Sequence, residues 1–394
     1  MQAALHVLLF LLALPPILAC AYIALLTLLS ARLRPPPPGG QQLRFDILVP
    51  AHDEEQVIAR TVASLRKLEW PAEQYRIVVI ADNCTDQTAS VAREHGATVF
   101  ERHDASRRGK GYALQFGMSR SAMDGFADAV VVIDADTVTT PNLLAAFASR
   151  IADGASAMQA NYGVLNPNDS WRTRTITIAY GAFHAVRSRA RERLGVSCGL
   201  RGNGMGFTRE LLNRLPFTLQ SMAEDLEYGI VLGLEGVRVH YVDEAEANAE
   251  LLPSAAGSDT QRHRWEGGRF AVARAYTGRL LARAVKPRGA LASDLALDLL
   301  TPPLGYIGLQ VMLVAVLATL ASIWQPAFLA WLWACVAMIL VLAAHILRGW
   351  QLCPLGPSAL LDLTRAPFFV LWKLGALFRH RRNKAWVKTR RLDE

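Results

Sequence analysis

The sequence predicts an α/β domain with a mostly parallel sheet, joined to about three membrane-spanning helices. Two observations indicate this: short β-rich runs alternate with helical stretches in the middle of the chain, and long uncharged apolar runs lie towards both ends. The composition agrees, because 52% of the 394 residues are hydrophobic and 19% are charged, whereas soluble domains carry about 25% charged residues. The composition therefore argues against a disordered chain and against an ordinary cytosolic enzyme.

Four β-rich runs in the central part predict strands that are buried on both faces. The strands are expected at 45–50, 76–81, 97–100 and 129–134, and helices are expected between them at 55–67, 86–95 and 111–123. This alternation is typical of a parallel sheet that binds a nucleotide-sized ligand at the carboxyl ends of its strands. Polar residues gather at those ends, over 52–55, 82–86 and 134–136, and indicate a functional site.

The N-terminal part, residues 1–31, predicts a transmembrane anchor. No charged residue lies between Ala4 and Leu29, which is long enough to cross a bilayer. No Lys or Arg precedes Arg32, so the positively charged start of a signal peptide is missing and an uncleaved anchor is expected. Residues 32–42 contain the run Pro-Pro-Pro-Pro-Gly-Gly and predict a stiff linker.

A second membrane segment is expected at 296–348. Two apolar runs, at about 299–323 and 327–347, are separated by one candidate turn and predict a transmembrane hairpin. Basic residues flank the apolar runs, including Arg34, Arg283 and Arg348. The positive-inside rule then places Met1 and the hairpin tip outside, with the central domain in the cytoplasm. We therefore expect a multi-pass protein of the inner (plasma) membrane.

The final segment, residues 349–394, predicts an interfacial helix followed by a basic cytoplasmic tail. The stretch 359–378 is apolar but carries Asp362, Arg365 and Lys373, which a fourth span would bury. The basic residues after 378 suit the head groups of anionic lipids or serve as a topology signal. The net charge of +8 is thus explained by membrane lipids as partners, without nucleic acid.

Asp134-Ala135-Asp136 is the most informative motif of the central domain. Its two carboxylates end a predicted buried strand and lie two residues apart, so both project to the same side. Such a pair can hold Mg²⁺ or Mn²⁺ while substrate phosphates fill the remaining positions. The alternative is that the two aspartates only cap the strand and form a turn.

Two later motifs offer chemistry that matches a metal-held phosphate. Glu224 and Asp225 open an apolar run, so they either stabilise a helix N-terminus or supply a general base. In Gln261-Arg262-His263-Arg264-Trp265, Arg264 offers paired donors to a diphosphate and Trp265 a flat face to a sugar ring. The alternative for this motif is a cation–π pair on an amphipathic helix.

Six motifs in order, VPAHDEE, ADNCTD, RGKGYAL, DAD, AED and QRHRW, resemble the membrane-bound family-2 glycosyltransferases. This inverting, nucleotide-sugar-using group includes cellulose and hyaluronan synthases and ceramide glucosyltransferase. The resemblance covers roughly 43–290 and implies a cytoplasmic domain of the GT-A nucleotide-diphospho-sugar transferase fold, usually with a UDP-sugar donor. The chain departs from the family by Ala223, where Thr is frequent, and by Ala81-Asp82-Asn83-Cys84, where Asp-Asp-Gly-Ser is frequent.

The resemblance implies a donor site at the strand ends. Asp82 would contact the uracil ring, with help from the backbone near Ala51 and Asp53, and Lys110 would lie near the nucleotide. Without the resemblance, Lys110 reads as a solvated loop lysine, and the pattern of a P-loop ATPase is missing. Asp134 and Asp136 would hold the diphosphate through Mg²⁺ or Mn²⁺, with Asp136 as the direct ligand.

The resemblance also implies an acceptor site. Asp225 would take the proton from the acceptor hydroxyl and Glu224 would orient it, while Gln261, Arg264 and Trp265 would bind the leaving diphosphate and the acceptor sugar. An in-line attack at the anomeric carbon needs such a base on one face and a neutralised diphosphate on the other.

Three functions remain open at this stage. The leading hypothesis is the transfer of one sugar, with inversion, from a nucleotide-sugar donor to a membrane lipid or lipid-linked oligosaccharide, in bacterial exopolysaccharide or glycolipid synthesis. The second is a processive polysaccharide synthase. The third is a catalytically inactive membrane scaffold with the same fold. The sugar, the acceptor and the linkage are not determined by the sequence.

Two further segments carry alternatives. The glycine-rich segment 199–207 is placed near the acceptor by the resemblance, but it also reads as a plain loop; it is no dinucleotide fingerprint, because it does not follow the first strand of a βαβ unit. The segment 172–193 is rich in arginine, with Arg187, Arg189, Arg191 and Arg193 at alternate positions. It predicts either a membrane-facing basic helix or a solvated one.

Overall fold

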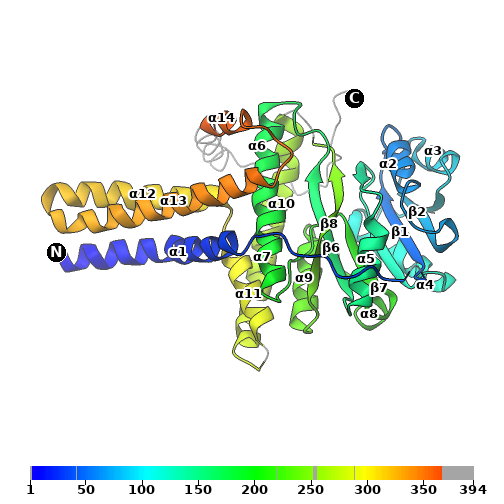
Figure 1. The fold of residues 1–394 in the computed structure, drawn as a ribbon, viewed down its shortest axis with the longest axis horizontal. Coiled ribbons are helices and arrows are strands. Elements are labelled where there is room, and N and C mark those ends of the chain that lie inside the picture. The colour runs from blue at the N-terminus through cyan, green and yellow to red at the C-terminus, as the bar shows by residue number, and fades with distance from the viewer. Residues whose placement is uncertain (1, 41, 220, 252–254, 288, 366–394) are drawn as a thin grey trace.

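The computed structural model describes residues 2–40, 42–219, 221–251, 255–287 and 289–365, and gives the backbone alone for 255–266. A rounded α/β body carries a long helical stalk that projects from one side (Figure 1). The body contains the sheet and the helices that cover it, and the stalk consists of apolar helices from both ends of the sequence.

The sheet of the described residues has eight strands in the order β3-β2-β1-β4-β7-β6-β8-β5. Pairing is parallel for β1 with β2 and β4, for β2 with β3, and for β6 with β8. β7 and β5 run antiparallel to their neighbours. The predicted mostly parallel sheet is confirmed. The strands are β1 Phe45–Ala51, β2 Tyr75–Asp82, β3 Thr98–Arg102, β4 Ala129–Val132, β5 Thr137–Thr139, β6 Ala157–Val164, β7 Met205–Thr208 and β8 Val239–Ala249.

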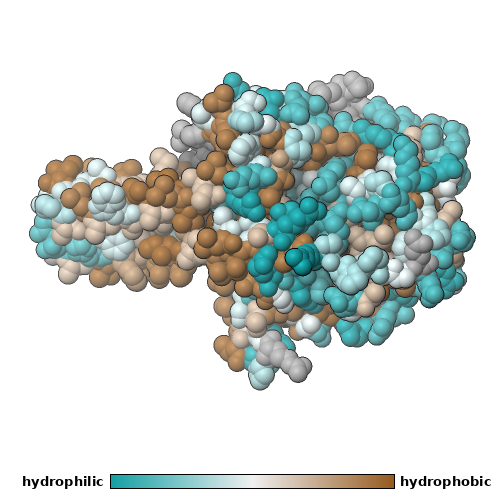
Figure 2. All heavy atoms as spheres, in the orientation of Figure 1, coloured by the Kyte–Doolittle hydropathy of each residue, from teal (hydrophilic) through white to brown (hydrophobic). Residues whose placement is uncertain are grey.

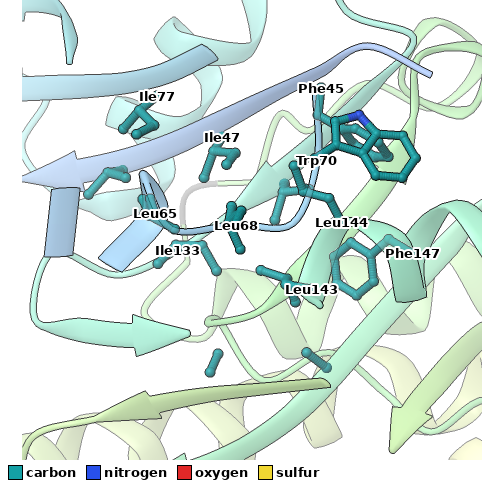
Figure 3. Close-up of a cluster of buried hydrophobic side chains, with 14 of the residues drawn as sticks. Phe45, Ile47, Leu65, Leu68, Trp70, Ile77, Ile133, Leu143, Leu144 and Phe147 are labelled. Atoms are coloured by element: carbon teal, nitrogen blue, oxygen red, sulfur yellow. The ribbon is translucent and has the colours of Figure 1, made fainter. Parts of the chain in front are cut away.

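Helices cover both faces of the sheet, because successive residues of each strand point to opposite sides. In β1, Ile47 and Val49 enter one core with Trp70 and Phe147, which Figure 3 shows in part, whereas Leu48 enters the other core. The helices of the body are α2 Ile58–Leu65, α3 Thr88–Glu94, α4 Lys110–Asp124, α5 Leu143–Ala152, α6 Trp171–Tyr180, α7 Arg187–Arg193, α8 Arg209–Arg214, α9 Glu224–Leu234 and α10 Ala255–Ala284.

The stalk contains three helices that are long and apolar enough to cross a membrane, as predicted: α1 Gln2–Leu28, α12 Leu304–Trp324 and α13 Leu329–Gln351. They pack through a common core that includes Ala13, Ile23 and Val311, while apolar side chains such as Met312 and Trp333 remain exposed. Figure 2 shows this apolar surface along the stalk, in contrast to the more hydrophilic body.

The membrane hairpin begins later than the apolar run suggested. The run from about 299 is divided at Pro302-Pro303 into α11, Ala290–Leu300, and α12. Proline lacks the amide hydrogen that a helix interior needs, so α11 packs beside α9 and α10 instead of continuing the span.

The Pro-Gly linker is packed on the body. The amide of Gly39 donates to Oγ of Ser149 at 3.1 Å, and a Cβ at Gly39 would lie 2.7 Å from the carbonyl oxygen of Ala148. Arg32 lies 3.9 Å from Asp243. Figure 1 shows the linker running from α1 across the body towards β1. The linker therefore contacts the body at Arg32 and Gly39.

Both interpretations of the basic segment 172–193 are wrong for Arg187 and Arg191. Arg187 and Arg191 are buried and pair with Asp298 and Asp294 of α11 at 2.5 and 2.7 Å. The sequence suggested a basic surface because the partners of these arginines lie more than 100 residues away, in α11, and leave no local pattern. Of the predicted interfacial helix, α14 Ala359–Asp362 and a short 3₁₀ turn are described; its remainder and the basic tail lie outside the described residues.

Candidate active site

The turn after β4 presents the two aspartates of the Asp-Ala-Asp motif. Asp134 and Asp136 are partly exposed, whereas Ala135 between them is buried. The buried side chain of Asn203 holds the turn: its Oδ1 accepts from the amide of Asp134 at 3.1 Å, and its Nδ2 donates to Oγ1 of Thr137 at 2.9 Å. The two carboxylates are thus positioned by the sheet and by the glycine-rich loop together.

Lys110 lies at this turn. It is the first residue of α4 and follows Gly109, whose φ of 126° suits glycine. The Nζ of Lys110 donates to Oδ1 of Asp134 and, at 2.7 Å, to the carbonyl oxygen of Gly202. Burial would lower the pKa of Lys110, but the charges of Asp134 and Glu224 outweigh it and raise the pKa. Lys110 is thus a charged partner of the carboxylates and no freely solvated loop lysine.

Asp225 reaches the same place from α9. A Cβ at Gly202 would lie 3.2 Å from Oδ2 of Asp225 and 3.5 Å from Nζ of Lys110. Gly202 has a φ of 80°, a conformation that residues with a side chain rarely adopt. A glycine here meets both requirements, and it allows Lys110, Asp134 and Asp225 to converge from three separate elements.

The carboxylates at the start of α9 hold their protons more tightly than usual. Burial and the neighbouring Asp225 raise the pKa of Glu224 to about 6, against the opposing charge of Lys110. Burial also raises the pKa of Asp225, although Lys110 and Arg201 act in the other direction. A raised pKa makes a carboxylate a stronger base than an ordinary one.

The ends of β1 and β2 form the neighbouring edge. Asp53 and Asn83 follow these strands, and each has a φ of 53°, which is uncommon outside glycine and concentrates at functional sites. Oδ1 of Asp53 accepts from the amide of Thr85 at 2.6 Å, and Sγ of Cys84 donates to the carbonyl of Ala51 at 3.5 Å. Ala51 and Asp53, both predicted to hold the nucleotide, therefore lie on one edge of the sheet, and hydrogen bonds to the loop after β2 hold them in place.

Asp82 ends β2 at the same edge and is buried. Its Oδ1 accepts from Arg102 at 2.5 Å and from Asn83 at 3.1 Å. The sequence did not single out Arg102, because its pairing depends on the register of β2 with β3, in which Asp82 lies beside Arg102.

The Asp-Ala-Asp turn has the chemistry that a divalent cation requires. Asp134 and Asp136 supply hard oxygen donors, which Mg²⁺ and Mn²⁺ prefer. Lys110 occupies one oxygen of Asp134 as a positive partner, and its single charge does not balance the two carboxylates. The residues therefore fit a divalent ion.

A second group of possible metal ligands, Asp53, Cys84 and Asp86, lies on the donor edge. Burial raises the pKa of the Cys84 thiol to about 11, so it is a poor ligand at neutral pH. Asp86 accepts from the amide of Thr88 at 2.9 Å. These contacts hold the loop together, and the Asp-Ala-Asp turn stays the predicted site of the divalent ion.

Aromatic rings that the sequence did not single out stand beside the aspartates. Tyr162 of β6, Tyr180 of α6 and His184 contact one another with ring centroids 4.7 to 5.5 Å apart. Burial raises the pKa of Tyr162, and the charges of Asp134 and Asp136 raise it further. His184 belongs to a π-helical turn, Gly181–Val186, a conformation that is frequent at functional sites. Isolated aromatic residues have no sequence signal of their own, so only the fold reveals this group.

The predicted residues Gln261, Arg264 and Trp265 are in α10, and their side chains lie outside the described part of the chain. The backbone of α10 does reach the site, because a Cβ at Gly268 would lie 2.8 Å from Cβ of Ala223, the residue before Glu224. The roles of these three side chains stay predictions.

The chain has a GT-A fold with a curled, mostly parallel sheet, and carboxylates lie at the ends of its strands. Residues 42–268 match the family model "Glycosyltransferase like family 2", and the chain therefore belongs to this glycosyltransferase family.

Curated relatives are similar at low identity. The probable glycosyltransferase YdaM of Bacillus subtilis is 25% identical over 236 residues, which cover 57% of this chain and 55% of the relative. A beta-monoglucosyldiacylglycerol synthase of Nostoc sp. is 29% identical over 230 residues, covering 56% and 48%. The chain spans about half the length of these curated relatives.

Among solved structures, the chain is similar to the mannosyltransferase PcManGT from Pyrobaculum calidifontis in complex with GDP-Man and Mn²⁺. The TM-score is 0.56 at 16% sequence identity, and the match covers 89% of this chain and 98% of the other. At this identity the likeness concerns the fold, and it extends beyond the family domain to most of the chain.

Proposed function

We propose that this protein transfers one sugar, with inversion, from a nucleotide-diphosphate sugar to a membrane lipid or lipid-linked oligosaccharide at the cytoplasmic face of the inner membrane. The observation that carries the proposal is the convergence of Lys110, Asp134 and Asp225 around Gly202. A donor-binding turn and a strong carboxylate base then lie within reach of one anomeric carbon. The family and the lipid glucosyltransferase among its relatives support the reaction class.

The donor, a UDP-sugar in this proposal, lies along the carboxyl edge of β1, β2 and β4. Asp82 and the backbone of Ala51 and Asp53 hold the base, and Lys110 neutralises part of the diphosphate. Asp134 and Asp136 hold Mg²⁺ or Mn²⁺, with Asp136 as the direct ligand; when bound, the ion stabilises the negative charge of the departing diphosphate. The GDP-Man and Mn²⁺ bound to PcManGT support a nucleotide sugar and a divalent ion here.

The acceptor hydroxyl lies on the opposite side of the anomeric carbon, beside Asp225. Asp225 accepts the hydroxyl proton as the new carbon–oxygen bond forms, and the bond from the anomeric carbon to the diphosphate breaks. Glu224 orients the acceptor. Attack opposite to the leaving group inverts the anomeric configuration. The raised pKa of Asp225 suits this role, because a general base works best with a pKa near the working pH.

The stalk explains why the acceptor is a lipid in this proposal. The three apolar helices are long enough to cross a membrane and would place the body beside it. α11 meets α1 of the stalk through Asp294 and Tyr22, and it packs with α10 against α9, the helix that begins with Glu224 and Asp225. Gln261, Arg264 and Trp265 of α10 would bind the leaving diphosphate and the acceptor sugar. A water-soluble donor enters from the body side, and a lipid acceptor enters from the stalk side.

The substitution Asp225→Asn tests the proposal. A donor screen that measures nucleotide release, with a membrane lipid extract as acceptor, first identifies the donor. Asp225→Asn should then lower sugar transfer by about 10²- to 10⁴-fold, the contribution of a general base, and leave UDP affinity in calorimetry unchanged. Asp153→Asn, an exposed carboxylate after α5, is the matched control. Transfer within a few-fold of wild type would remove Asp225 from the mechanism.

A further inference from the structure

Three arginines gather behind the carboxylate site. Arg191 and Arg201 both donate to the carbonyl oxygen of Cys198, at 3.4 and 3.0 Å. The guanidinium groups of Arg187 and Arg201 both lie over the ring of Phe183, 5.0 and 4.4 Å from its centroid. Like charges repel at such distances, so this cluster exists only because negative groups compensate it.

The carboxylates nearby do not balance the positive charge of this arginine cluster. Asp298 pairs with Arg187 at 2.5 Å and with Arg191 at 3.4 Å, and Asp294 pairs with Arg191 at 2.7 Å. Arg269 joins the same group through the backbone carbonyl of Thr301 at 3.1 Å. With Arg201, four guanidinium groups meet two carboxylates. Among the side chains that the structure describes, no carboxylate lies within ion-pair distance of Arg201.

Arg201 carries the excess charge of this cluster. It is partly exposed, yet burial and the neighbouring Arg191 lower its pKa to about 10, against the opposing charge of Asp298. A desolvated charge without a carboxylate in ion-pair contact is costly, so an anion beside Arg201 would be stabilised strongly.

Three buried polar atoms of these residues lack a hydrogen-bond partner in the part of the chain that the structure describes. The Nδ1 of His184 is buried and has no hydrogen-bond partner among the described residues, and the same holds for Nε of Arg201 and Nε of Arg187. His184 is 8% exposed. Burial and the two arginines hold the pKa of His184 well below its usual value, so its ring is neutral and can donate one hydrogen bond. Buried polar atoms of this kind normally have partners.

The cluster lies between the carboxylates and the stalk. Arg201 precedes Gly202, which abuts Asp225. On the other side, the hydroxyl of Tyr22 in α1 donates to Asp294 at 2.8 Å, and Gly181, at the start of the turn that carries His184, packs against Gly349 of α13. A ligand that touches Arg201 therefore lies next to the proposed base and next to a membrane-spanning helix.

We propose that Arg201 and His184 form a subsite for the phosphodiester of a phospholipid acceptor whose head group carries a free hydroxyl. The phosphodiester accepts from Arg201 and from Nδ1 of His184, with Arg187 and Arg191 adding positive potential, and the head-group hydroxyl reaches Asp225. This inference rests on the proposed function and names its acceptor class.

The test measures lipid retention without any donor, so that it is independent of sugar transfer. The full-length protein is placed in phosphatidylcholine nanodiscs that contain equal amounts of phosphatidylglycerol and diacylglycerol, and retained lipid is counted by native mass spectrometry. Wild type should retain phosphatidylglycerol in preference to diacylglycerol. Arg201→Gln should reduce that retention about tenfold, equivalent to about 1.4 kcal/mol, and Arg201→Lys should reduce it less.

A control variant and a second test variant make the result decisive. Arg93→Gln removes an exposed arginine that pairs with Glu101 at the far edge of the sheet and should retain phosphatidylglycerol like wild type. His184→Phe keeps the aromatic packing and should lower retention while UDP affinity, which reports an intact fold, stays unchanged.

Three results would overturn the subsite: equal retention of both lipids by wild type, unchanged retention by Arg201→Gln, or a loss of UDP affinity in Arg201→Gln with lipid retention unchanged. The last result would assign Arg201 to the donor diphosphate. Selective retention of phosphatidylglycerol without any sugar transfer would instead refute the proposed function and leave the subsite standing.

Discussion

The carboxylates at the start of α9 and Asp298 of α11 differ in how their surroundings affect the pKa. Glu224 and Asp225 are partly exposed, share one lysine with Asp134, and have raised pKa values. Asp298 is buried between arginines; burial alone would raise its pKa, but Arg191 and Arg187 hold it well below the usual range.

The difference lies in the partners and their number. A carboxylate with too little positive charge nearby becomes a stronger base and a ligand for cations, whereas one that meets two guanidinium groups is locked in its ionised form. The first group can exchange protons and bind a metal or substrate. The second ties α7 and α11 together at the base of the stalk, through the pairs of Arg187 and Arg191.

The largest effect expected from this contrast concerns stability. Asp298→Asn leaves Arg187 and Arg191 without their shared partner, and breaking such a buried pair costs about 3–5 kcal/mol. Asp225→Asn should leave the free energy of unfolding unchanged or raise it, because burial already disfavours the charge of Asp225. Chemical denaturation in detergent measures both variants. Equal destabilisation by the two substitutions would show that the groups do not differ as argued.

The next effect concerns the metal. Asp136→Ala should weaken UDP binding about 10- to 100-fold, or about 1.4–2.7 kcal/mol, because the cation that links the carboxylate to the diphosphate is lost. Exhaustive chelation of wild type should give the same loss, and it should leave Asp136→Ala unaffected. Full activity after chelation would contradict the assignment of Asp134 and Asp136 as metal ligands.

The smallest effect is a change with pH. Glu224 orients the acceptor as an ionised carboxylate, and its pKa beside Asp225 is raised to about 6, so transfer should fall as the pH drops through about 6. An ordinary carboxyl, with a pKa near 4.3, would keep its activity to lower pH. The lowered pKa of Asp298 keeps that pair ionised across the same range, so circular dichroism should show an intact fold. An acid limb near pH 4 would contradict the raised pKa.

The sequence alone was sufficient for most features that depend on neighbouring residues, although it missed the helix break at Pro302-Pro303. Apolar runs predicted the three stalk helices, and alternating patterns predicted the strands β1 to β4 to within about two residues of their ends. The Asp-Ala-Asp and Glu-Asp motifs were found because both carboxylates of each lie close together in the chain. Their likeness to a known family then supplied roles that no local pattern contains.

Only the tertiary structure decided which charges meet. Asp134 pairs with Lys110, 24 residues away, and Arg187 pairs with Asp298, 111 residues away, where the sequence suggested a basic surface. Arg201 and His184 carried no signal, since their importance lies in the partners that they lack. Hydrophobic periodicity reports which face of an element is buried, but the energy of a buried charge depends on groups that only the folded chain brings together.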